Sequence, residues 1–339
     1  MSEPLVVIDA DVLGRQRTGD ETYVEQLLRA LPAVARDLRL AAITRRPELV
    51  PPGIEPIPLA ARVQELRMAV RLPLLLRRLR PALAHFVHSL PLHVPSPSVL
   101  TVQDLSFERD ASLMGRRETA IFRAVVPRSA RRAARVLAIS QRTKDDLVQL
   151  YGLPPEKVVV TPLAYDSIFR PEPDGSHDDY LLLVGAIERR KDPLAAAAAA
   201  EELGLPLVSV GPARDAALAS ELRRRGVDVR GFVEKDELAR LYRRAACLLF
   251  PSRYEGFGLP VAEGMASGVP VVASGDAAVR EVAGDAILYA DRGDLAAAVR
   301  RALAERSRLV EGGLERARRF SWAETARLTA EVYREVLDS

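Results

Sequence analysis

Short apolar segments alternate with helical segments along the whole chain, and this alternation constrains the fold more than any other feature of the sequence. The first apolar segment, residues 5–9, has the continuous apolar pattern of a strand that is buried on both faces. Residues 22–33 follow with apolar side chains at helical spacing, among them Tyr23, Leu27 and Leu31. Because strands and helices continue to alternate, we expect parallel sheets with helices on both faces.

The same pattern predicts the other elements. In the first half, strands are predicted at residues 39–44, 56–59, 83–87, 99–102, 135–139 and 157–161, and helices at 62–80, 116–134 and 142–151, the last with Ser140 as its N-cap. In the second half, strands are predicted at 181–184, 207–210, 228–231, 247–250 and 270–273. Helices are predicted there at 213–225, 235–245, 260–266, 294–308 and 322–337, and another begins at Pro193 after Asp192 as N-cap.

Pro, Gly and Asp are concentrated in residues 166–179, which is the composition of a linker between domains. The length of 339 residues suits two domains, and the alternation of strands and helices resumes at residue 180. We therefore predict two doubly wound α/β domains of similar size, residues 1–165 and 180–321, joined by this linker.

The composition excludes several classes of protein. No apolar run approaches the ~18 residues of a membrane-spanning helix, and the N-terminus lacks the basic region of a secretory signal. Cys247 is the only cysteine, so no disulfide can form within the chain, and four scattered His give no metal-ligand spacing. We therefore expect a cytoplasmic protein without a bound metal or cofactor.

Positive charge is concentrated in the first half of the chain. Residues 62–80 contain six Arg and one Glu, and residues 116–135 contain seven Arg and one Glu, although the whole chain has 49 basic and 46 acidic residues. The segment 62–80 mixes Arg with apolar residues, which is compatible with an amphipathic helix at a membrane surface. Since only four basic residues are Lys, a general preference for Arg is the alternative. Aromatic residues make up 5% of the chain, and no nucleic-acid partner is expected.

A glycine-rich segment at residues 252–268 carries the strongest signal for a ligand site. It follows a predicted buried strand and leads into a helix that we expect to begin with Pro260 at its first position. The carboxyl ends of strands are where open α/β sheets bind ligands, and Gly256 and Gly258 let the backbone approach a ligand closely. The N-terminus of the helix would then favour a phosphate group.

Two carboxylates flank this loop, eight residues apart. Glu255 precedes the glycines, and Glu263 is expected in the first turn of the helix, where the helix dipole would keep it ionised. Carboxylates accept hydrogen bonds from sugar or ribose hydroxyls. The alternative is a glycine-rich turn with a Glu that only complements the helix dipole.

The motif Pro-Ser-Arg-Tyr-Glu-Gly-Phe-Gly-Leu-Pro, with the second Glu after it, resembles the signature of glycosyltransferase family 4. Further segments of the chain resemble that family in the same order: residues 102–107, 138–140, 161–166, 184–192, 231–233 and 270–274. The resemblance implies the GT-B fold, in which two Rossmann-like domains face each other across a cleft. It also implies that a final helix, residues 322–339, returns to complete the N-terminal domain, which binds the acceptor.

The resemblance further implies roles for residues of the C-terminal domain. Glu255 would contact the donor sugar and Glu263 the nucleotide ribose, while Lys191 and Arg190 would be the cations that stabilise a departing diphosphate without a metal. The other residues implied in donor binding are Gly185, Val233, Gly256, Phe257, Gly258 and Leu259.

In the N-terminal domain, Gly19 would lie in a glycine loop that approaches the diphosphate, between the first strand and the first helix. Asp20 and Glu21 are acceptor-side candidates, or alternatively only N-terminal helix carboxylates. Many relatives have His-Asp where this chain has Gln103-Asp104, and Asp104 is a third acceptor-side candidate. Gln can hydrogen-bond to a hydroxyl but cannot take up a proton near neutral pH.

Three His lie near this position in the sequence, and each is expected to be a packing residue rather than a replacement for the missing His. They are His85, His88 and His93.

The function that follows from the resemblance is retaining transfer of a hexose, mannose or glucose, from a nucleotide diphosphate sugar to a hydroxyl. The donor would be GDP- or UDP-linked, and the acceptor a glycan, a lipid-linked group or a small molecule. A peripheral contact with the inner face of a membrane is compatible with the Arg-rich N-terminal domain. The alternatives are a nucleotide-sugar-binding subunit impaired by Gln103, or a nucleotide-sugar epimerase.

Overall fold

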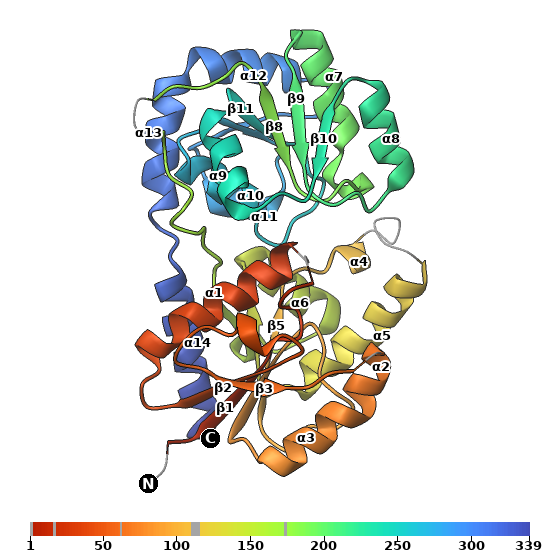
Figure 1. The fold of residues 1–339 in the computed structure, drawn as a ribbon, viewed down its shortest axis with the longest axis vertical. Coiled ribbons are helices and arrows are strands. Elements are labelled where there is room, and N and C mark those ends of the chain that lie inside the picture. Colours follow the sequence, from red (N-terminus) through yellow and green to blue (C-terminus); the bar gives the residue numbers. More distant parts are fainter. Residues whose placement is uncertain (1–2, 16–17, 62, 110–115, 173–174) are drawn as a thin grey trace. The chain divides into compact units, whose positions relative to one another are not determined.

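All strands pair in parallel, in two separate sheets (Figure 1). The structure is a computed structural model that describes residues 3–15, 18–61, 63–109, 116–172 and 175–339. The chain divides into two units. The N-terminal unit contains the residues up to Leu163 together with Trp322–Ser339, and the C-terminal unit is Ala164–Ser321.

The N-terminal unit has a seven-stranded sheet in the order β3-β2-β1-β4-β5-β6-β7. Its strands are β1 Leu5–Asp9, β2 Arg39–Thr44, β3 Glu55–Pro58, β4 Leu83–Val87, β5 Ser98–Val102, β6 Arg135–Ala138 and β7 Val158–Val160. Its helices are α1 Thr18–Val34, α2 Gln64–Leu66, α3 Leu72–Leu79, α4 Ser106–Arg109, α5 Arg116–Arg132, α6 Gln141–Tyr151 and α14 Trp322–Leu337.

The C-terminal unit has a six-stranded sheet in the order β10-β9-β8-β11-β12-β13. Its strands are β8 Leu181–Val184, β9 Leu207–Val210, β10 Asp228–Gly231, β11 Cys247–Phe250, β12 Val271–Ala273 and β13 Leu288–Tyr289. Its helices are α7 Pro193–Leu203, α8 Ala216–Arg224, α9 Lys235–Arg244, α10 Leu259–Ala266, α11 Ala277–Ala283, α12 Leu295–Ala304 and α13 Arg306–Ala317.

Both sheets have the doubly wound order, so the predicted fold class is confirmed. In each sheet the first three strands run outward in one direction and the fourth returns to the other side of the first. The point of reversal lies between β1 and β4 in one unit and between β8 and β11 in the other. In such sheets, ligands bind at the carboxyl ends of the two strands that flank this point.

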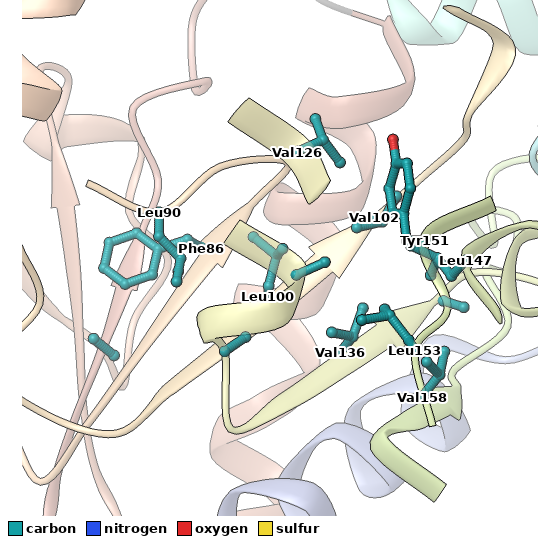
Figure 2. Packing of buried hydrophobic residues seen from close by; sticks show 14 of the residues in the cluster. Phe86, Leu90, Leu100, Val102, Val126, Val136, Leu147, Tyr151, Leu153 and Val158 are labelled. Carbon is teal, nitrogen blue, oxygen red and sulfur yellow. The ribbon is translucent and has the colours of Figure 1, made fainter. Parts of the chain in front are cut away.

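Apolar side chains from strands and helices fill the core of each unit. In the N-terminal unit, Phe86 and Leu100 from the sheet belong to the same cluster as Val126 of α5 and Leu147 of α6, and Figure 2 shows Phe86 beside Leu90 and Leu147 beside Tyr151. In the C-terminal unit, Leu181 and Leu249 of the central strands belong to the corresponding cluster. The two cores are separate, as the two repeats of the sequence pattern predict.

Several predicted boundaries were wrong. The segment 294–308 forms two helices, α12 and α13, and the segment 213–225 begins its helix at Ala216, because Asp215 caps it by accepting a hydrogen bond from the Leu218 amide. Pro260 is the second residue of α10, not the first. Asp192 is the N-cap residue of α7 and Pro193 its first residue, as predicted, but the Asp192 side chain makes no capping hydrogen bond and pairs instead with Arg253 and Arg292.

The segment 166–179 lies on the C-terminal unit. Asp166 pairs with Lys235 at 3.0 Å, Glu172 with Arg243 at 3.2 Å, and Asp178 with Arg244 at 2.5 Å. In the N-terminal unit, α14 contacts α1, and the Thr325 hydroxyl donates to the Pro162 carbonyl at 2.5 Å. No helix within the described ranges is long and apolar enough to cross a membrane.

Candidate functional site

The carboxyl ends of β8 and β11 bring together the charged residues of the C-terminal unit. Arg190 and Lys191 follow β8 in a short 3₁₀ turn, and Glu255 follows β11. The two loops are joined, because the Arg253 amide donates to the Arg190 carbonyl at 2.9 Å. These side chains therefore meet at the reversal point of the sheet, where the doubly wound topology predicts a ligand site.

Glu255 is held by both cations. Lys191 Nζ donates to Glu255 Oε1 at 2.5 Å, and Arg190 lies 3.2 Å from Glu255 Oε2. Arg190 also donates to the Tyr254 carbonyl at 2.6 Å and to Glu188 at 2.9 Å. Glu188 was not among the predicted site residues, although it directly precedes three basic residues in the sequence.

Burial and charge act in opposite directions on these groups. Burial raises the pKa of Glu255, but Lys191 and Arg190 together outweigh it and hold that pKa below its ordinary value. Burial also lowers the pKa of Lys191, and the Glu255 charge offsets only part of that effect. The site thus contains an ionised carboxylate between two cations, an arrangement suited to exchange one anionic partner for another.

Two glycines shape the backbone around Lys191. Gly185 directly follows β8 with a φ of 140°, and a Cβ there would lie 3.4 Å from the Lys191 side chain. Gly211 packs against it from the end of β9, where a Cβ would lie only 2.1 Å from the Gly185 carbonyl oxygen. Only glycine fits at this second position.

The glycine-rich loop leads directly into α10. Gly258 has a φ of 97° and is the N-cap of the helix, with no side-chain hydrogen bond at that end. Phe257 is buried with its ring edge-to-face against Phe320, at 5.4 Å between centroids. The loop is therefore anchored by an aromatic side chain, while the N-terminus of α10 begins at Leu259 beside Gly256 and Gly258.

Glu263 differs from its prediction. It is the fifth residue of α10, beyond the first turn, and its carboxylate accepts a hydrogen bond from the Tyr242 hydroxyl at 2.8 Å. Burial raises its pKa to about 7. Burial therefore shifts the pKa of Glu263 in the direction opposite to that expected from the helix dipole. Tyr242 was missed by the sequence analysis, since it lies on another helix, α9.

Val233, one of the residues implied in donor binding, follows β10 and is half-buried. Its neighbour Phe232 exposes 46% of its surface. The role of Val233 in donor binding stays a prediction.

In the N-terminal unit, Gly19 and Gln103 lie together. A Cβ on Gly19 would lie 3.5 Å from Gln103 Oε1, and the Gln103 amide nitrogen is buried without a hydrogen-bond partner among the described residues. Gly19 belongs to α1, which begins at Thr18, so the expected glycine loop at this position is instead the first turn of a helix. An orphaned buried donor is costly unless a ligand satisfies it.

The acceptor-side candidates have different partners. Asp20 lies 3.1 Å from Nε2 of His88, which follows β4 with a left-handed φ of 62°. Glu21 accepts from the Gly14 amide, and Asp104 accepts from the amide and hydroxyl of Ser106. Asp104 thus stabilises the turn that leads into α4. His88, which was expected to be a packing residue, instead pairs with the acceptor-side candidate Asp20.

His85 is a structural residue, as predicted. It is fully buried, with Nδ1 2.6 Å from the Tyr333 hydroxyl and Nε2 2.7 Å from the Thr101 hydroxyl. Burial lowers its pKa to about 3, so the ring is neutral. His93 is exposed.

Comparisons with known proteins agree with these motifs. Residues 17–167 match the family model described as Glycosyltransferase Family 4, and residues 178–305 match the model described as Glycosyl transferases group 1. D-inositol 3-phosphate glycosyltransferase 1 of Catenulispora acidiphila is 31% identical over 284 residues, which are 71% of this chain and 67% of that protein. The chain belongs to glycosyltransferase family 4.

Two mannosyltransferases are among the relatives of this family 4 chain. O-antigen chain mannosyltransferase B of Escherichia coli is 29% identical over 59% of this chain and 60% of that protein. The MMP alpha-(1->4)-mannosyltransferase of Mycolicibacterium hassiacum is 30% identical over 62% and 56%. The chain therefore spans less than two thirds of the length of either of them.

Solved structures show that the fold is GT-B. Sucrose-phosphate synthase from Thermosynechococcus elongatus has a TM-score of 0.77 and 19% identity, covering 99% of this chain and 100% of that one. Anabaena Alr3699/HepE, solved in complex with UDP-glucose, has a TM-score of 0.74 and 14% identity, covering 98% and 100%. At these identities the likeness concerns the fold alone.

Proposed function

We propose that this family 4 chain transfers a hexose, mannose or glucose, from a GDP- or UDP-linked donor to an acceptor hydroxyl, with retention of configuration. The observation that carries the proposal is the Arg190–Glu255–Lys191 cluster at the carboxyl ends of β8 and β11. The two mannosyltransferase relatives and the UDP-glucose complex of a structural neighbour support this class of donor.

The donor is assigned to the C-terminal unit. The diphosphate binds Lys191 and Arg190 together with the N-terminus of α10, because fixed cations and free helix amides stabilise negative charge. Glu255 then releases these cations and accepts a hydrogen bond from a hydroxyl of the sugar. The implied contact of Glu263 is with the ribose, and that of Val233 with the base.

Transfer exchanges one bond to the anomeric carbon for another. The bond from that carbon to the diphosphate oxygen breaks, and a bond to the acceptor oxygen forms on the same face. The acceptor proton passes to the departing phosphate oxygen, so no protein nucleophile is required. Lys191 and Arg190 stabilise the charge that develops on the leaving group.

The acceptor is assigned to the N-terminal unit, with Asp20, Glu21 and Asp104 as candidates. Gln103 supplies an unsatisfied amide donor beside Gly19, which suits a hydroxyl oxygen. The acceptor class is a glycan, a lipid-linked group or a small molecule.

A second candidate function, a nucleotide-sugar-binding subunit without turnover, is favoured by Gln103 alone, because an amide cannot carry a proton. It predicts that the wild-type chain binds a nucleotide diphosphate but neither transfers nor hydrolyses the donor sugar, and that Gln103→His gains that activity.

Glu255→Gln tests the main proposal. We expect loss of donor turnover by about a hundredfold or more, with nucleotide diphosphate affinity kept or increased, because the variant no longer neutralises the two cations. Turnover is measured as release of the labelled sugar, and affinity by calorimetry. The matched control is Glu202→Gln, on the exposed face of α7. Equal turnover by Glu255→Gln and the wild type would overturn the proposal.

A further inference from the structure

Segment 63–79, which is helical from Gln64 onward, exposes four large apolar side chains to solvent. Val63, Leu66, Val70 and Leu74 expose 51%, 48%, 44% and 60% of their surfaces. Leu66, Val70 and Leu74 follow one another at intervals of four residues along α2, the following π-helical turn at Arg67–Arg71, and α3, and Val63 directly precedes α2 in an extended conformation. We call these four residues the apolar stripe.

The opposite face of the same segment fixes its orientation. Leu72, Pro73 and Leu76 are buried against the N-terminal unit. Arg67 is fully buried in the π-helical turn and donates to both carboxylate oxygens of Asp9, at 2.5 and 3.0 Å. Because these contacts prevent the helix from turning the stripe inward, its exposure is a property of the fold.

The stripe continues into a neighbouring loop. The Leu92 amide donates to the Met68 carbonyl at 3.1 Å, and the Leu92 side chain is 74% exposed. Arg132 of α5 donates to the Leu92 carbonyl at 3.2 Å. Among the described residues, nine large hydrophobic side chains expose 40% or more of their surface. Five of these nine are Leu92 and the four residues of the apolar stripe. Such a concentration marks an interaction surface.

Positive charge surrounds this apolar surface. Arg71, Arg77, Arg78 and Arg80 are exposed on or directly after the segment, against a single exposed acidic side chain, Glu65. On α5, which lies along the same edge of the N-terminal unit in Figure 1, further exposed arginines are Arg128, Arg131 and Arg132. The cores of protein–protein interfaces are depleted of charge, whereas Arg around an apolar stripe is typical of helices that lie in a membrane interface.

We propose that the apolar stripe, Leu92 and the flanking arginines dock the N-terminal unit on the surface of an anionic lipid bilayer. The apolar side chains enter the region between headgroups and acyl chains, and the arginines reach the lipid phosphates with their aliphatic stems along the stripe. This surface does not depend on the donor site, so its test is independent of the proposed function.

Flotation of the full chain with vesicles tests the proposal. The wild type is expected to float with vesicles of phosphatidylcholine and phosphatidylglycerol, and about tenfold or more weakly with phosphatidylcholine alone. Binding should also fall as salt increases, because surface charges are screened. Absence of binding to the anionic vesicles would overturn the proposal.

Two pairs of variants separate the apolar and electrostatic parts. Val70→Ser with Leu74→Ser should weaken vesicle binding by about tenfold or more, while Leu49→Ser with Leu150→Ser, at exposed apolar sites elsewhere in the unit, should not. Arg77→Gln with Arg78→Gln should weaken it similarly, while Arg300→Gln with Arg301→Gln, on exposed sites of α12, should not. Equal loss in test and control variants would contradict the assignment.

Light scattering of the same proteins tests a different occupant of the stripe. If the wild type is a dimer that Val70→Ser with Leu74→Ser converts to a monomer, the stripe is a contact between copies of this chain and the membrane proposal is wrong. The proposal expects the same oligomeric state for both proteins. Nucleotide titration of each variant checks that the C-terminal unit is unchanged.

Discussion

Lys191 and Glu255 are buried together, and burial disfavours the charged form of each. Their contact of 2.5 Å, with Arg190 at 3.2 Å on the other carboxylate oxygen, keeps the carboxylate ionised. Buried pairs of this kind contribute little net stability compared with apolar residues of similar size, because desolvation offsets the attraction. For that reason we attribute the cluster to function and not to stability. It holds Lys191 and Arg190 at the position where a diphosphate is expected to bind.

Glu263 gives the C-terminal unit a specific pH dependence. Its pKa is about 7 in the folded chain against an ordinary 4.5, so the folded state holds a proton that the unfolded state has lost between those values. Stability therefore falls as the pH rises from about 4.5 to about 7. Glu263→Gln removes this effect and keeps an acceptor for the Tyr242 hydroxyl. We expect the variant to be about 3 kcal/mol more stable than the wild type at pH 8 and similar at pH 5.

Urea unfolding at pH 5 and pH 8, followed by circular dichroism, measures this difference. A gap between variant and wild type that is the same at both pH values would show that Glu263 is ionised throughout.

Sequence motifs located the residues of the candidate site but not their electrostatic state. Lys191 and Glu255 could be named because each follows a predicted strand and the ends of parallel strands meet. The protonation of Glu263 could not be predicted, because it depends on burial and on Tyr242, 21 residues away in the sequence. The pairing of His88 with Asp20 likewise depends on tertiary contact across 68 residues.

At the scale of elements, β8 and β9 are held in place by two glycines at their carboxyl ends. Gly211→Ala would place a methyl group 2.1 Å from the Gly185 carbonyl oxygen, on a backbone with a φ of 140°. We expect the free energy of unfolding to fall by about 3 kcal/mol or more, because of overpacking together with backbone strain. We also expect weaker nucleotide binding, because Gly185 adjoins Lys191. Gly226→Ala, also at positive φ but in open space, should cost only about 1–2 kcal/mol.

The comparison is made by urea unfolding of both variants. Similar losses of unfolding free energy in Gly211→Ala and Gly226→Ala would mean that the close approach of Gly211 to Gly185 does not constrain the fold.

Periodicity and breakers predicted most elements, and the failures have local causes. Helix α1 begins at Thr18 rather than residue 22, and Asp20 and Glu21 in its first turn complement the helix dipole. The predicted helix 62–80 contains Pro73, yet residues 64–79 are helical, since Pro73 stands in the first turn of α3, after a π-helical turn. Helix α11 and strand β13 were missed because seven and two residues are too short to show a period.

At the scale of the whole molecule, the two ends of the sequence build the same unit. Helix α14 packs on α1, with Trp322 against Tyr23 and Arg334 paired with Asp37 at 2.7 Å. The resemblance to family 4 implied this return, and neither periodicity nor spacing could have shown it. A buried chain of hydrogen bonds, from Tyr333 through His85 and Thr101 to Tyr23, continues the contact into the sheet.

Tyr333→Phe breaks this chain at one end. His85 Nδ1 would be left buried without a partner, at a cost of about 1–3 kcal/mol to the N-terminal unit. Trp322 is the only tryptophan and lies in that unit, so its fluorescence reports the unfolding of the N-terminal unit selectively. We expect a lower urea midpoint by fluorescence with nucleotide affinity unchanged. An unchanged midpoint would mean that the hydrogen bond does not stabilise the unit.

The central claim is that the cluster after β8 and β11 binds the diphosphate of a sugar nucleotide. Calorimetric titration of UDP, GDP and ADP into the wild type, Lys191→Ala and Arg189→Ala tests it most directly. Lys191 is buried beside Glu255, whereas the Arg189 side chain is 77% exposed and serves as the matched control. We predict that the wild type and Arg189→Ala bind one of the nucleotides equally. Lys191→Ala should bind it more weakly by about 1.5–3 kcal/mol, the contribution of a charge-assisted hydrogen bond. Binding of none of the three, or equal binding by Lys191→Ala, would contradict the claim.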